Sequence, residues 1–473
     1  MTTQLRRISG IITGPALFAM VILSPLELDL SQKFVLGIAL WMAIWWITEA
    51  IPLYATSLIP LALFPVLGIV SIDKVFMSYI DKIVLLFLGG FLLAKAIEKS
   101  GLHRRFALNL LKTFGTKPKY VIGAFIIVTA SLSGWMTNTA TTLLMLPIAV
   151  AITSQIKNSD EKSKFGTCIM LCVAYSASIG GLATLIGTPP NALFASLSET
   201  LTGMEVSFAQ WMTIGVPVSV VSLAVLWYYM VNFAKLNNAS AILGTKKIVI
   251  QELSKLGKMT RDEKIVGIVF ACTALAWITR GLLWKDLFPF VEDYTIAIVA
   301  VIVLLVVSSS NNNRGRLLDL KSARTIPWGV LVLIGGGLAL AGGFTASGLD
   351  LQIANQLSFV SGMEYFLIVL IVVAVTIFSG ELMSNTAGAA LLLPIMVSLA
   401  TTMDIDPIFL MAPVAIATSY GFIMPVATPP NAIVIGSGYV TAKKMARFGI
   451  PLNIISIMLV SVLMTVLVPL VWQ

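Results

Sequence analysis

The stretch GWMTNTATTLLMLPI, residues 134–148, and the stretch ELMSNTAGAALLLPI, residues 381–395, share one unusual pattern. Each carries three adjacent polar side chains between two apolar runs. These polar residues are Thr137, Asn138, Thr139, Ser384, Asn385 and Thr386. Whether each apolar segment continues through such an island, or breaks there and turns back, decides the fold of the chain.

The composition is typical of a membrane protein. Of the 473 residues, 58% are hydrophobic and 11% are charged, whereas a soluble protein has about 25% charged residues. Many segments contain about 20 apolar residues, enough to cross a bilayer as a helix. The single histidine, His103, and three cysteines provide no metal-binding constellation. No paired carboxylates converge at one depth either. We therefore predict an all-α polytopic membrane protein that is not an enzyme.

Hydrophobicity divides the chain into eleven predicted transmembrane helices and two longer segments. The predicted spans lie near residues 11–26, 35–50, 52–71, 83–98, 167–195, 209–234, 264–283, 294–310, 326–346, 407–439 and 448–472. The two longer segments, 120–157 and 362–402, exceed one crossing, and each has a polar island at its middle. A helix, a break and a returning helix would make each one a re-entrant hairpin. Non-helical backbone at membrane depth requires protein or water around it.

Basic residues favour one orientation of this layout. With the N-terminus inside, the inner loops collect most of the lysine and arginine, including the cluster at 104–119 and the linker 235–263, whereas the outer loops hold few. This bias predicts a multi-pass protein of the cell membrane with a cytoplasmic N-terminus and an extracytoplasmic C-terminus. No small-residue cleavage site follows the first apolar run, so we expect that span to be retained.

The chain also contains an internal repeat. FLGGFLLAKAIEKSGL, residues 87–102, aligns with LIGGGLALAGGFTASGL, residues 333–349, at an offset of 247. The islands share this offset, and GTPPNAL (187–193) matches ATPPNAI (427–433) at 240. Because an odd number of spans separates equivalent points, the two halves have opposite orientations, as in many secondary transporters. The predicted organisation is an N-terminal segment, a first repeat, a cytoplasmic linker and a second repeat. Their boundaries are 1–34, 35–234, 235–263 and 264–473.

The repeated motifs have the chemistry of an ion and anion site. A hairpin tip exposes the N-terminus of its second helix, whose N–H groups and dipole favour an anion. Hydroxyl and amide oxygens, with unwound carbonyls, can bind a hard cation such as Na⁺. The paired prolines of TPPN interrupt a helix and leave carbonyls free. The alternative is that these residues only connect and kink helices, but four motifs in two matched pairs favour a site.

These motifs resemble those of the divalent anion/sodium symporter family, the INDY-type dicarboxylate transporters. The resemblance rests on TNTATTLLMLP, SNTAGAALLLP, both TPPNA segments and WWITEAIPLYATS (45–57), and extends from about residue 35 to the end. It implies inverted repeats, hairpins, a homodimer in the bilayer and elevator-type transport. It implies a C4-dicarboxylate, citrate or sulfate as substrate and Na⁺ as the coupling ion, with no organic cofactor.

The resemblance also implies site residues. The first sodium site would involve Ser133, Asn138 and Gly187, and the second would involve Gly380, Asn385 and Ala427. The substrate would contact residues of the islands and of the TPPN motifs. These are Thr137, Asn138, Thr139, Ser384, Asn385, Thr386, Thr188, Thr428 and Pro429. Two positions depart from the family pattern: Thr137 replaces a usual serine, and Gly380 replaces the threonine of a bacterial dicarboxylate transporter.

The expected function is sodium-coupled import of C4-dicarboxylates such as succinate, malate and fumarate. The alternatives are a cation-independent dicarboxylate or tricarboxylate exchanger, which the loss of a side-chain ligand at Gly380 keeps open, and a sulfate transporter of the same family. Segments 120–195 and 362–439 carry the motifs and are expected to move as a transport unit against a scaffold of the remaining spans. Glu381, three residues before an island, is a candidate carrier of a coupling proton.

Overall fold

The computed structural model describes residues 3–236, 244–310, 315–357, 359 and 362–472. Within these residues, every named secondary-structure element is a helix. The main helices are α1 (Thr3–Leu23), α2 (Leu30–Thr48), α6 (Lys82–Ser100), α8 (Pro118–Ser133), α9 (Asn138–Thr153), α10 (Ser159–Gly180), α11 (Pro189–Thr202), α12 (Phe208–Phe233), α14 (Arg261–Thr279), α15 (Asp293–Val306), α17 (Trp328–Ser347), α19 (Tyr365–Gly380), α20 (Asn385–Thr402), α21 (Ile408–Ala417), α22 (Pro429–Ile435) and α23 (Ala442–Val471). Shorter helices are α3 (Leu53–Thr56), α4 (Ile59–Val66), α5 (Ile72–Tyr79), α7 (Leu102–Lys112), α13 (Thr245–Lys255), α16 (Leu320–Ala323) and α18 (Leu349–Gln356).

Both polar islands lie at helix breaks. The first predicted hairpin segment forms α8 and α9, separated by residues 134–137, and the second forms α19 and α20, separated by residues 381–384. In each pair the two helices pack against one another. The second helix begins at the island asparagine, because the preceding Thr137 or Ser384 is extended and its hydroxyl accepts a backbone N–H bond, as an N-cap does. The islands therefore end one helix and start the next.

The TPPN motifs also start helices. α10 continues through a short 3₁₀ turn, η1 (Gly181–Ala183), and extended residues before α11, while α21 and α22 are separated by residues 418–428. Pro189 and Pro429 are the first residues of α11 and α22. Proline is favoured there because the first helical N–H has no intrahelical partner. The prolines thus begin the second half of each broken span and do not kink a continuous helix.

The repeat found in the sequence is visible in backbone detail. Gly101 and Gly348, 247 residues apart, both end a helix in the left-handed conformation, at φ +84° and +68°. The amide of Asn191 donates to the carbonyls of Gly181 and Thr184 at 3.1 and 2.8 Å. At an offset of 240, the amide of Asn431 donates to Gly421 and Met424 at 2.9 and 3.0 Å. Each asparagine holds its unwound segment closed by the same pair of bonds.

Among the described residues, six helices are long and apolar enough to cross a membrane by length and composition. They are α2, α10 with η1, α12, α17, α20 and α23. The predicted spans 83–98 and 264–283 form the 19-residue helices α6 and α14, whereas several others correspond to shorter apolar helices: 52–71, for example, forms α3 and α4 rather than one helix. Pro52, Pro60 and Pro65 provide the reason, since each lacks a backbone N–H. The coarse prediction of an all-helical protein with several apolar helices is confirmed.

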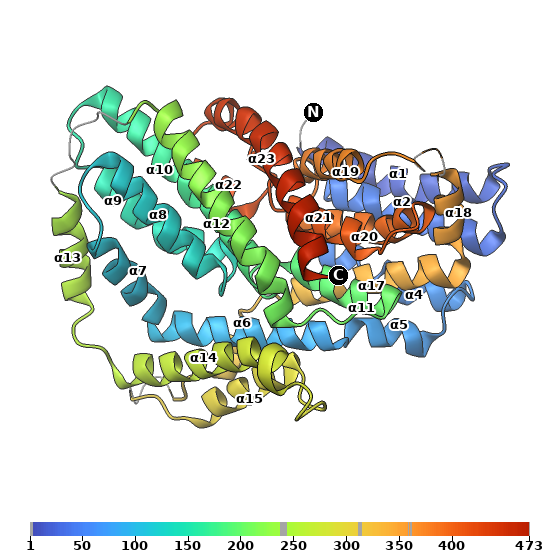
Figure 1. Cartoon of the computed structure of the whole chain (residues 1–473), viewed down its shortest axis with the longest axis horizontal. Coiled ribbons are helices and arrows are strands. Elements are labelled where there is room, and N and C mark those ends of the chain that lie inside the picture. Colours follow the sequence, from blue (N-terminus) through green and yellow to red (C-terminus); the bar gives the residue numbers. More distant parts are fainter. Residues whose placement is uncertain (1–2, 237–243, 311–314, 358, 360–361, 473) are drawn as a thin grey trace.

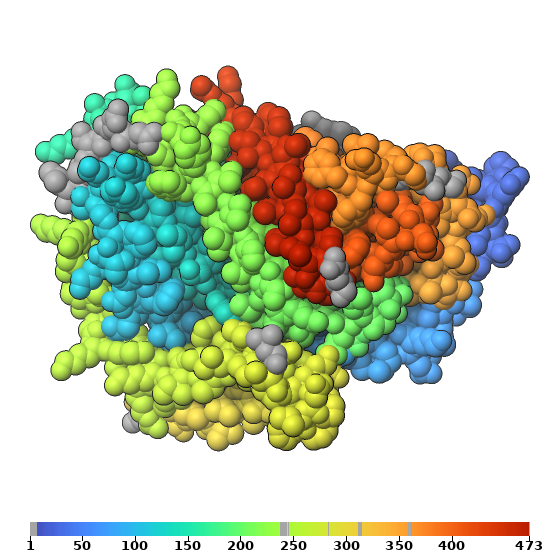
Figure 2. Space-filling view, viewed as in Figure 1, coloured from blue at the N-terminus to red at the C-terminus, as the bar shows by residue number. Residues whose placement is uncertain are grey.

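The helices separate into groups in Figure 1. α6, α14 and α15 pack together along the lower edge, whereas α8, α10 and α12 lie above them. α12 and α23 pack side by side and run across the front of the molecule, where their surfaces meet in Figure 2. α12 packs against α8, α10 and η1, and α23 packs against α19 and α21. Both long helices therefore support the broken segments directly.

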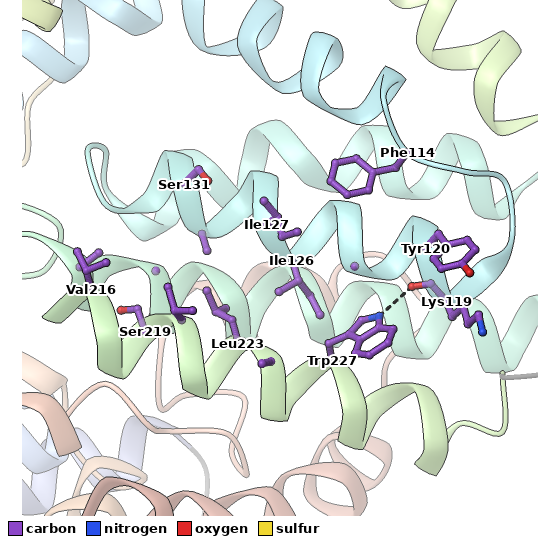
Figure 3. Close-up of a pocket in the computed structure, with 16 residues that line it drawn as sticks. Phe114, Lys119, Tyr120, Ile126, Ile127, Ser131, Val216, Ser219, Leu223 and Trp227 are labelled. Carbon is purple, nitrogen blue, oxygen red and sulfur yellow. Dashed lines mark hydrogen bonds between the residues drawn. The ribbon is translucent and has the colours of Figure 1, made fainter. Parts of the chain in front are cut away.

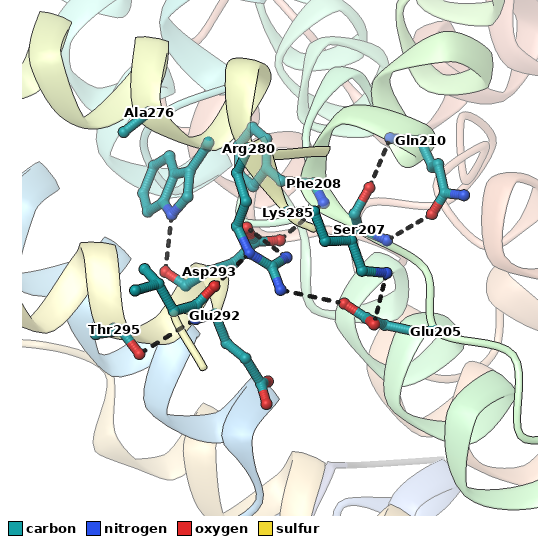
Figure 4. A network of polar contacts seen from close by, with 12 residues as sticks. Glu205, Ser207, Phe208, Gln210, Ala276, Arg280, Lys285, Glu292, Asp293 and Thr295 are labelled. Atoms are coloured by element: carbon teal, nitrogen blue, oxygen red, sulfur yellow. Dashed lines mark hydrogen bonds and ion pairs between the residues drawn. The ribbon is translucent and has the colours of Figure 1, made fainter. Parts of the chain in front are cut away.

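A buried arginine connects two of these groups (Figure 4). Arg280, at the end of α14, is 2% exposed and lies 3.3 Å from the Asp293 carboxylate and 3.5 Å from that of Glu205. Glu205 belongs to the α11–α12 connection and also pairs with Lys285 at 2.8 Å. Partial burial raises the pKa of Glu205, but Lys285 and Arg280 lower it further, so the net shift is downward. The charged network ties the α11–α12 connection to α14 and α15.

Candidate functional site

One cavity of about 550 Å³ brings the four polar motifs together. Its wall contains all nine residues predicted to contact substrate. They are Thr137, Asn138, Thr139, Thr188, Ser384, Asn385, Thr386, Thr428 and Pro429. The carbonyl-bearing Gly187 and Ala427 also line it, whereas Ser133 and Gly380 do not. Residues almost 300 positions apart in the chain therefore meet at one place, and the volume is that of a small-molecule site.

Helix N-termini surround this cavity. Thr137, Thr188, Ser384 and Thr428 are the N-cap residues of α9, α11, α20 and α22, and all four have extended backbone conformations. The N-terminal ends of α9 and α20 carry free N–H groups and a partial positive charge. The hydroxyls of Thr139 and Thr386 stand in the first turns of these helices. This arrangement can hold carboxylates by dipoles and hydroxyl donors.

The three residues predicted for the first sodium site converge around Gly181. The Ser133 hydroxyl lies 2.7 Å from the Asn138 side-chain oxygen. A Cβ atom added at Gly181 would lie 2.8 Å from that oxygen and 3.1 Å from the Gly187 carbonyl oxygen. Glycine thus leaves a small recess beside the oxygens of Asn138 and Gly187, with the Ser133 hydroxyl bonded to the first of them, next to the cavity that Asn138 also lines. Oxygen donors of this kind suit a hard cation, and the residues fit Na⁺.

Two members of the second predicted set, Gly380 and Ala427, lie near Gly421, the equivalent of Gly181. A Cβ atom at Gly421 would lie 3.0 Å from the Ala427 side chain and 3.7 Å from the Gly380 carbonyl oxygen. The side-chain oxygen of Asn385 is buried and has no hydrogen-bond partner in the protein. A buried oxygen without a partner is costly, and a cation would satisfy it. Gly380 contributes its carbonyl and no side chain, so this set relies on Asn385 and backbone oxygens.

Other residues of the cavity were not predicted as site residues. Lys95 and Glu98 of α6 line it and form an ion pair at 3.0 Å. Phe91 on the same helix, Met136 and Thr325 complete parts of the wall. Lys95 is the basic residue of the described wall. Its spacing from Phe91 and Glu98 on one helical face is the signal that places all three together.

Glu381 is enclosed by hydrogen-bond donors. It is 4% exposed, and its carboxylate accepts the backbone N–H groups of Phe422, Ile423 and Met424 at 2.8, 3.0 and 2.8 Å. The amide of Asn453 on α23 donates to it at 2.8 Å. An ionised carboxylate is purely an acceptor and matches these four donors. The geometry therefore indicates that Glu381 fixes the unwound segment before α22, rather than exchanging a proton.

Two solved structures resemble this fold. The YdaH transporter of Alcanivorax borkumensis superposes with a TM-score of 0.60, covering 85% of this chain and 89% of that chain, at 13% identity. MtrF of Neisseria gonorrhoeae, described with a class of antimetabolite efflux pumps, gives a TM-score of 0.56 over 94% of this chain and 96% of that one, at 12% identity. At these identities the likeness concerns the fold alone.

Proteins related in sequence give more specific information than the fold, because they identify the family. A sodium-dependent dicarboxylate transporter, SdcS, of Staphylococcus saprophyticus is 41% identical over 472 residues, which cover 97% of this chain and 91% of the relative. SdcS of Staphylococcus aureus is 38% identical over 474 residues, with 98% and 91% covered. The family model of the sodium:sulfate symporter transmembrane region matches residues 7–472. The resemblance inferred from the motifs is thereby confirmed: the chain belongs to the sodium:sulfate symporter family, a family of membrane transporters and not of enzymes.

Proposed function

We propose that this protein imports C4-dicarboxylates such as succinate, malate and fumarate together with Na⁺. The observation that carries the proposal is the cavity in which the four polar motifs and the N-termini of α9 and α20 meet, with the recess at Gly181 and the unpartnered oxygen of Asn385 beside it. The names of the 38–41% identical relatives supply the chemical class of the substrate. A dianion in this cavity would be held by helix N-termini, hydroxyls and bound Na⁺. Lys95, which is already paired with Glu98, is the cation in the described wall.

Uptake into proteoliposomes tests this function. With labelled succinate outside, an inward Na⁺ gradient should drive accumulation many-fold above the level with K⁺ in its place. Empty vesicles and the Asn138→Ala variant serve as controls. Unlabelled malate, fumarate, citrate and sulfate, each added in excess, would rank the substrates. Uptake that proceeds equally in K⁺, or only when the vesicles contain a dicarboxylate, would establish a cation-independent exchanger instead.

The arrangement in the membrane is part of the proposal. α8–α9 and α19–α20 act as re-entrant hairpins within two inverted repeats, with the N-terminus cytoplasmic and the C-terminus extracytoplasmic. The matched asparagine bonds at an offset of 240 and the distribution of basic residues support this topology. The protein resides in the cell membrane as a homodimer, as the family resemblance implies.

Transport by an elevator movement follows from the same proposal. The four motifs must stay together for the site to survive, so segments 120–195 and 362–439 move as a unit. The contacts favour adding α12 and α23, which the sequence placed in the scaffold. Trp211 of α12 donates to the Leu182 carbonyl at 2.9 Å, and Asn453 of α23 bonds to Glu381. The scaffold then contains α1–α6 and α14–α18.

A cross-link tests this division of the molecule. Glu205 and Lys285 pair across the proposed boundary, so Glu205→Cys with Lys285→Cys, joined by a short bifunctional thiol reagent, should abolish uptake while succinate still binds from the open side. The exposed Cys272 is first replaced by serine; the other two cysteines are buried. Lys82→Cys with Glu292→Cys is the matched control, because this pair, 3.1 Å apart, lies within the scaffold. Full uptake by the cross-linked Glu205–Lys285 variant would contradict the rigid-body movement.

A further inference from the structure

A second cavity, separate from the proposed transport site, lies between α8 and α12 (Figure 3). Its volume is about 550 Å³, and its wall is almost entirely apolar. The mouth is open, because Ile127 and Val220 along its length are 45% and 58% exposed. The function proposed above uses none of its lining residues. A deep apolar groove on a membrane protein needs an occupant that is itself apolar.

The two ends of this groove differ in chemistry. At one end lie Lys119, Tyr120 and Trp227, where the Lys119 ammonium is 5.3 Å from the centre of the Tyr120 ring. The Trp227 indole donates to the Lys119 carbonyl at 2.9 Å, a bond drawn in Figure 3. Aromatic residues and lysine mark the level of lipid headgroups. The tryptophan N–H is satisfied, which leaves the Lys119 ammonium and the Tyr120 hydroxyl as donors at this end, and the ammonium is the charged one.

The opposite end is closed and uncharged. Ala130 and Gly180 pack so closely there that a Cβ atom on Gly180 would lie 2.4 Å from the Cα of Ala130. Ser219 donates its hydroxyl to the Ile179 carbonyl at 2.9 Å, so its polar group is already bonded. The groove is therefore basic and aromatic at one end only, while the other end carries no charge, which is the pattern of a binding site for an amphiphile.

The length of the groove fits one lipid leaflet. On α8 the lining extends from Lys119 to Ser131, and on α12 from Trp227 back to Val216. Eleven or twelve helical residues span about 17 Å at 1.5 Å per residue, close to half of the roughly 30 Å hydrocarbon core of a bilayer. A chain entering beside Lys119 would reach the closed end at about the middle of the membrane.

We propose that this groove binds one anionic phospholipid, with an acyl chain between α8 and α12 and the headgroup phosphate at Lys119. The neighbouring Lys112 and Lys117 give this end of α8 a positive field, and basic pockets beside membrane helices bind anionic headgroups. Positive residues also face the cytoplasm, so the lipid comes from the inner leaflet. The bound acyl chain lies against the α8–α9 hairpin, which carries the first island. The groove is therefore a lipid site on the proposed transport unit.

Native mass spectrometry of the full chain tests the proposal. Protein released from vesicles of phosphatidylglycerol and phosphatidylcholine in equal amounts should retain one phosphatidylglycerol per chain in preference to phosphatidylcholine. Ala224 is an exposed residue of the groove wall, so Ala224→Phe should fill the groove and abolish retention. Val221→Phe, on the same helix but outside the wall, is its control. Lys119→Ala should reduce the headgroup preference about fivefold, and Lys117→Ala, which lies outside the wall and adds only to the positive field, should reduce it less.

Several results would overturn the assignment. Ala224→Phe protein that retains as much phosphatidylglycerol as the wild type would show that the lipid binds elsewhere. Equal retention of the two lipids by the wild type would contradict the selection of an anionic headgroup by Lys119. Displacement by inorganic phosphate would mean that the site takes a free anion, whereas no displacement supports the lipid. If Ala224→Phe shifts the oligomeric state and leaves retention intact, the groove is covered by a second copy. Gel filtration and thermal unfolding confirm that each variant is folded.

Discussion

Replacement of Asn138 or Asn385 by alanine is expected to reduce sodium-driven succinate uptake to near background while leaving a folded protein. Both amides lie in the cavity wall; Asn138 also lies beside the recess at Gly181, and the side-chain oxygen of Asn385 is buried without a protein partner, so the loss of either is expected to weaken two ligands at once. A hydrogen bond to a charged group contributes about 1.5–3 kcal/mol, or about ten- to a hundredfold in affinity. For Asn385 the buried oxygen has no protein partner to lose. Removal of this oxygen is therefore expected to lower the affinity for the ligands more than the stability of the protein.

The measurement is initial uptake as a function of both Na⁺ and succinate. Half-saturating concentrations of both should rise in each variant. Asn109→Ala is a suitable control, because this exposed amide bonds only to a carbonyl of its own helix at 3.0 Å, outside the cavity wall. Wild-type uptake by both island variants would exclude the islands from the mechanism. A change in succinate dependence alone would separate substrate binding from ion binding.

Replacement of Glu381 by glutamine is expected to destabilise the protein and to abolish uptake, despite the similar shape of the two side chains. The glutamine amide would place its own N–H groups against backbone donors from residues 422–424 or against Asn453. One acceptor oxygen is lost in a buried site, at a cost of about 3 kcal/mol for bonds to a charged group. The segment leading to Ala427 and Thr428 would then lose its fixed position.

Thermal unfolding with and without Na⁺, together with uptake at several pH values, distinguishes this positioning role from proton coupling. A proton carrier replaced by glutamine would stay folded and would lose the pH dependence of transport. A positioning residue would instead lose thermal stability and the stabilisation by Na⁺. Glu364→Gln, at the exposed N-terminal end of α19 and without a side-chain cap bond, is the matched control. A stable Glu381→Gln protein with wild-type uptake would contradict the positioning role.

The parts of the site that repeat could be predicted from the sequence. Two islands and two TPPN motifs at constant offsets indicated one site, and the cavity contains all four. Residues that act through distant contacts were not predictable. Glu381 meets amides 41 to 43 positions further along the chain, and no local pattern marks that meeting. Periodicity puts Phe91, Lys95 and Glu98 on one face of α6, but the packing of the helices decides that this face turns toward the cavity.

The ends of the helices were likewise predictable only where a local sequence pattern marks them. Hydrophobicity located the apolar segments but not their internal breaks where prolines act, so 52–71 was predicted as one span and forms two short helices. The break at each island was predictable, since Thr137 and Ser384 are good N-cap residues. Supporting helices such as α12 and α23 carry no polar island, and the sequence therefore gave no indication that they pack on the broken segments.

The position of Asn138, shared by a recess and the cavity, has a consequence for the direction of flow. In a site built this way, a bound Na⁺ and a bound dianion favour each other by the same factor. The affinity for the dianion is then set by the salt on whichever side the cavity faces. Where Na⁺ is abundant outside and scarce in the cytoplasm, the same site binds the dianion tightly when it faces outward and weakly when it faces inward. The low Na⁺ concentration in the cytoplasm would then promote dissociation of the dianion, without any salt bridge having to break.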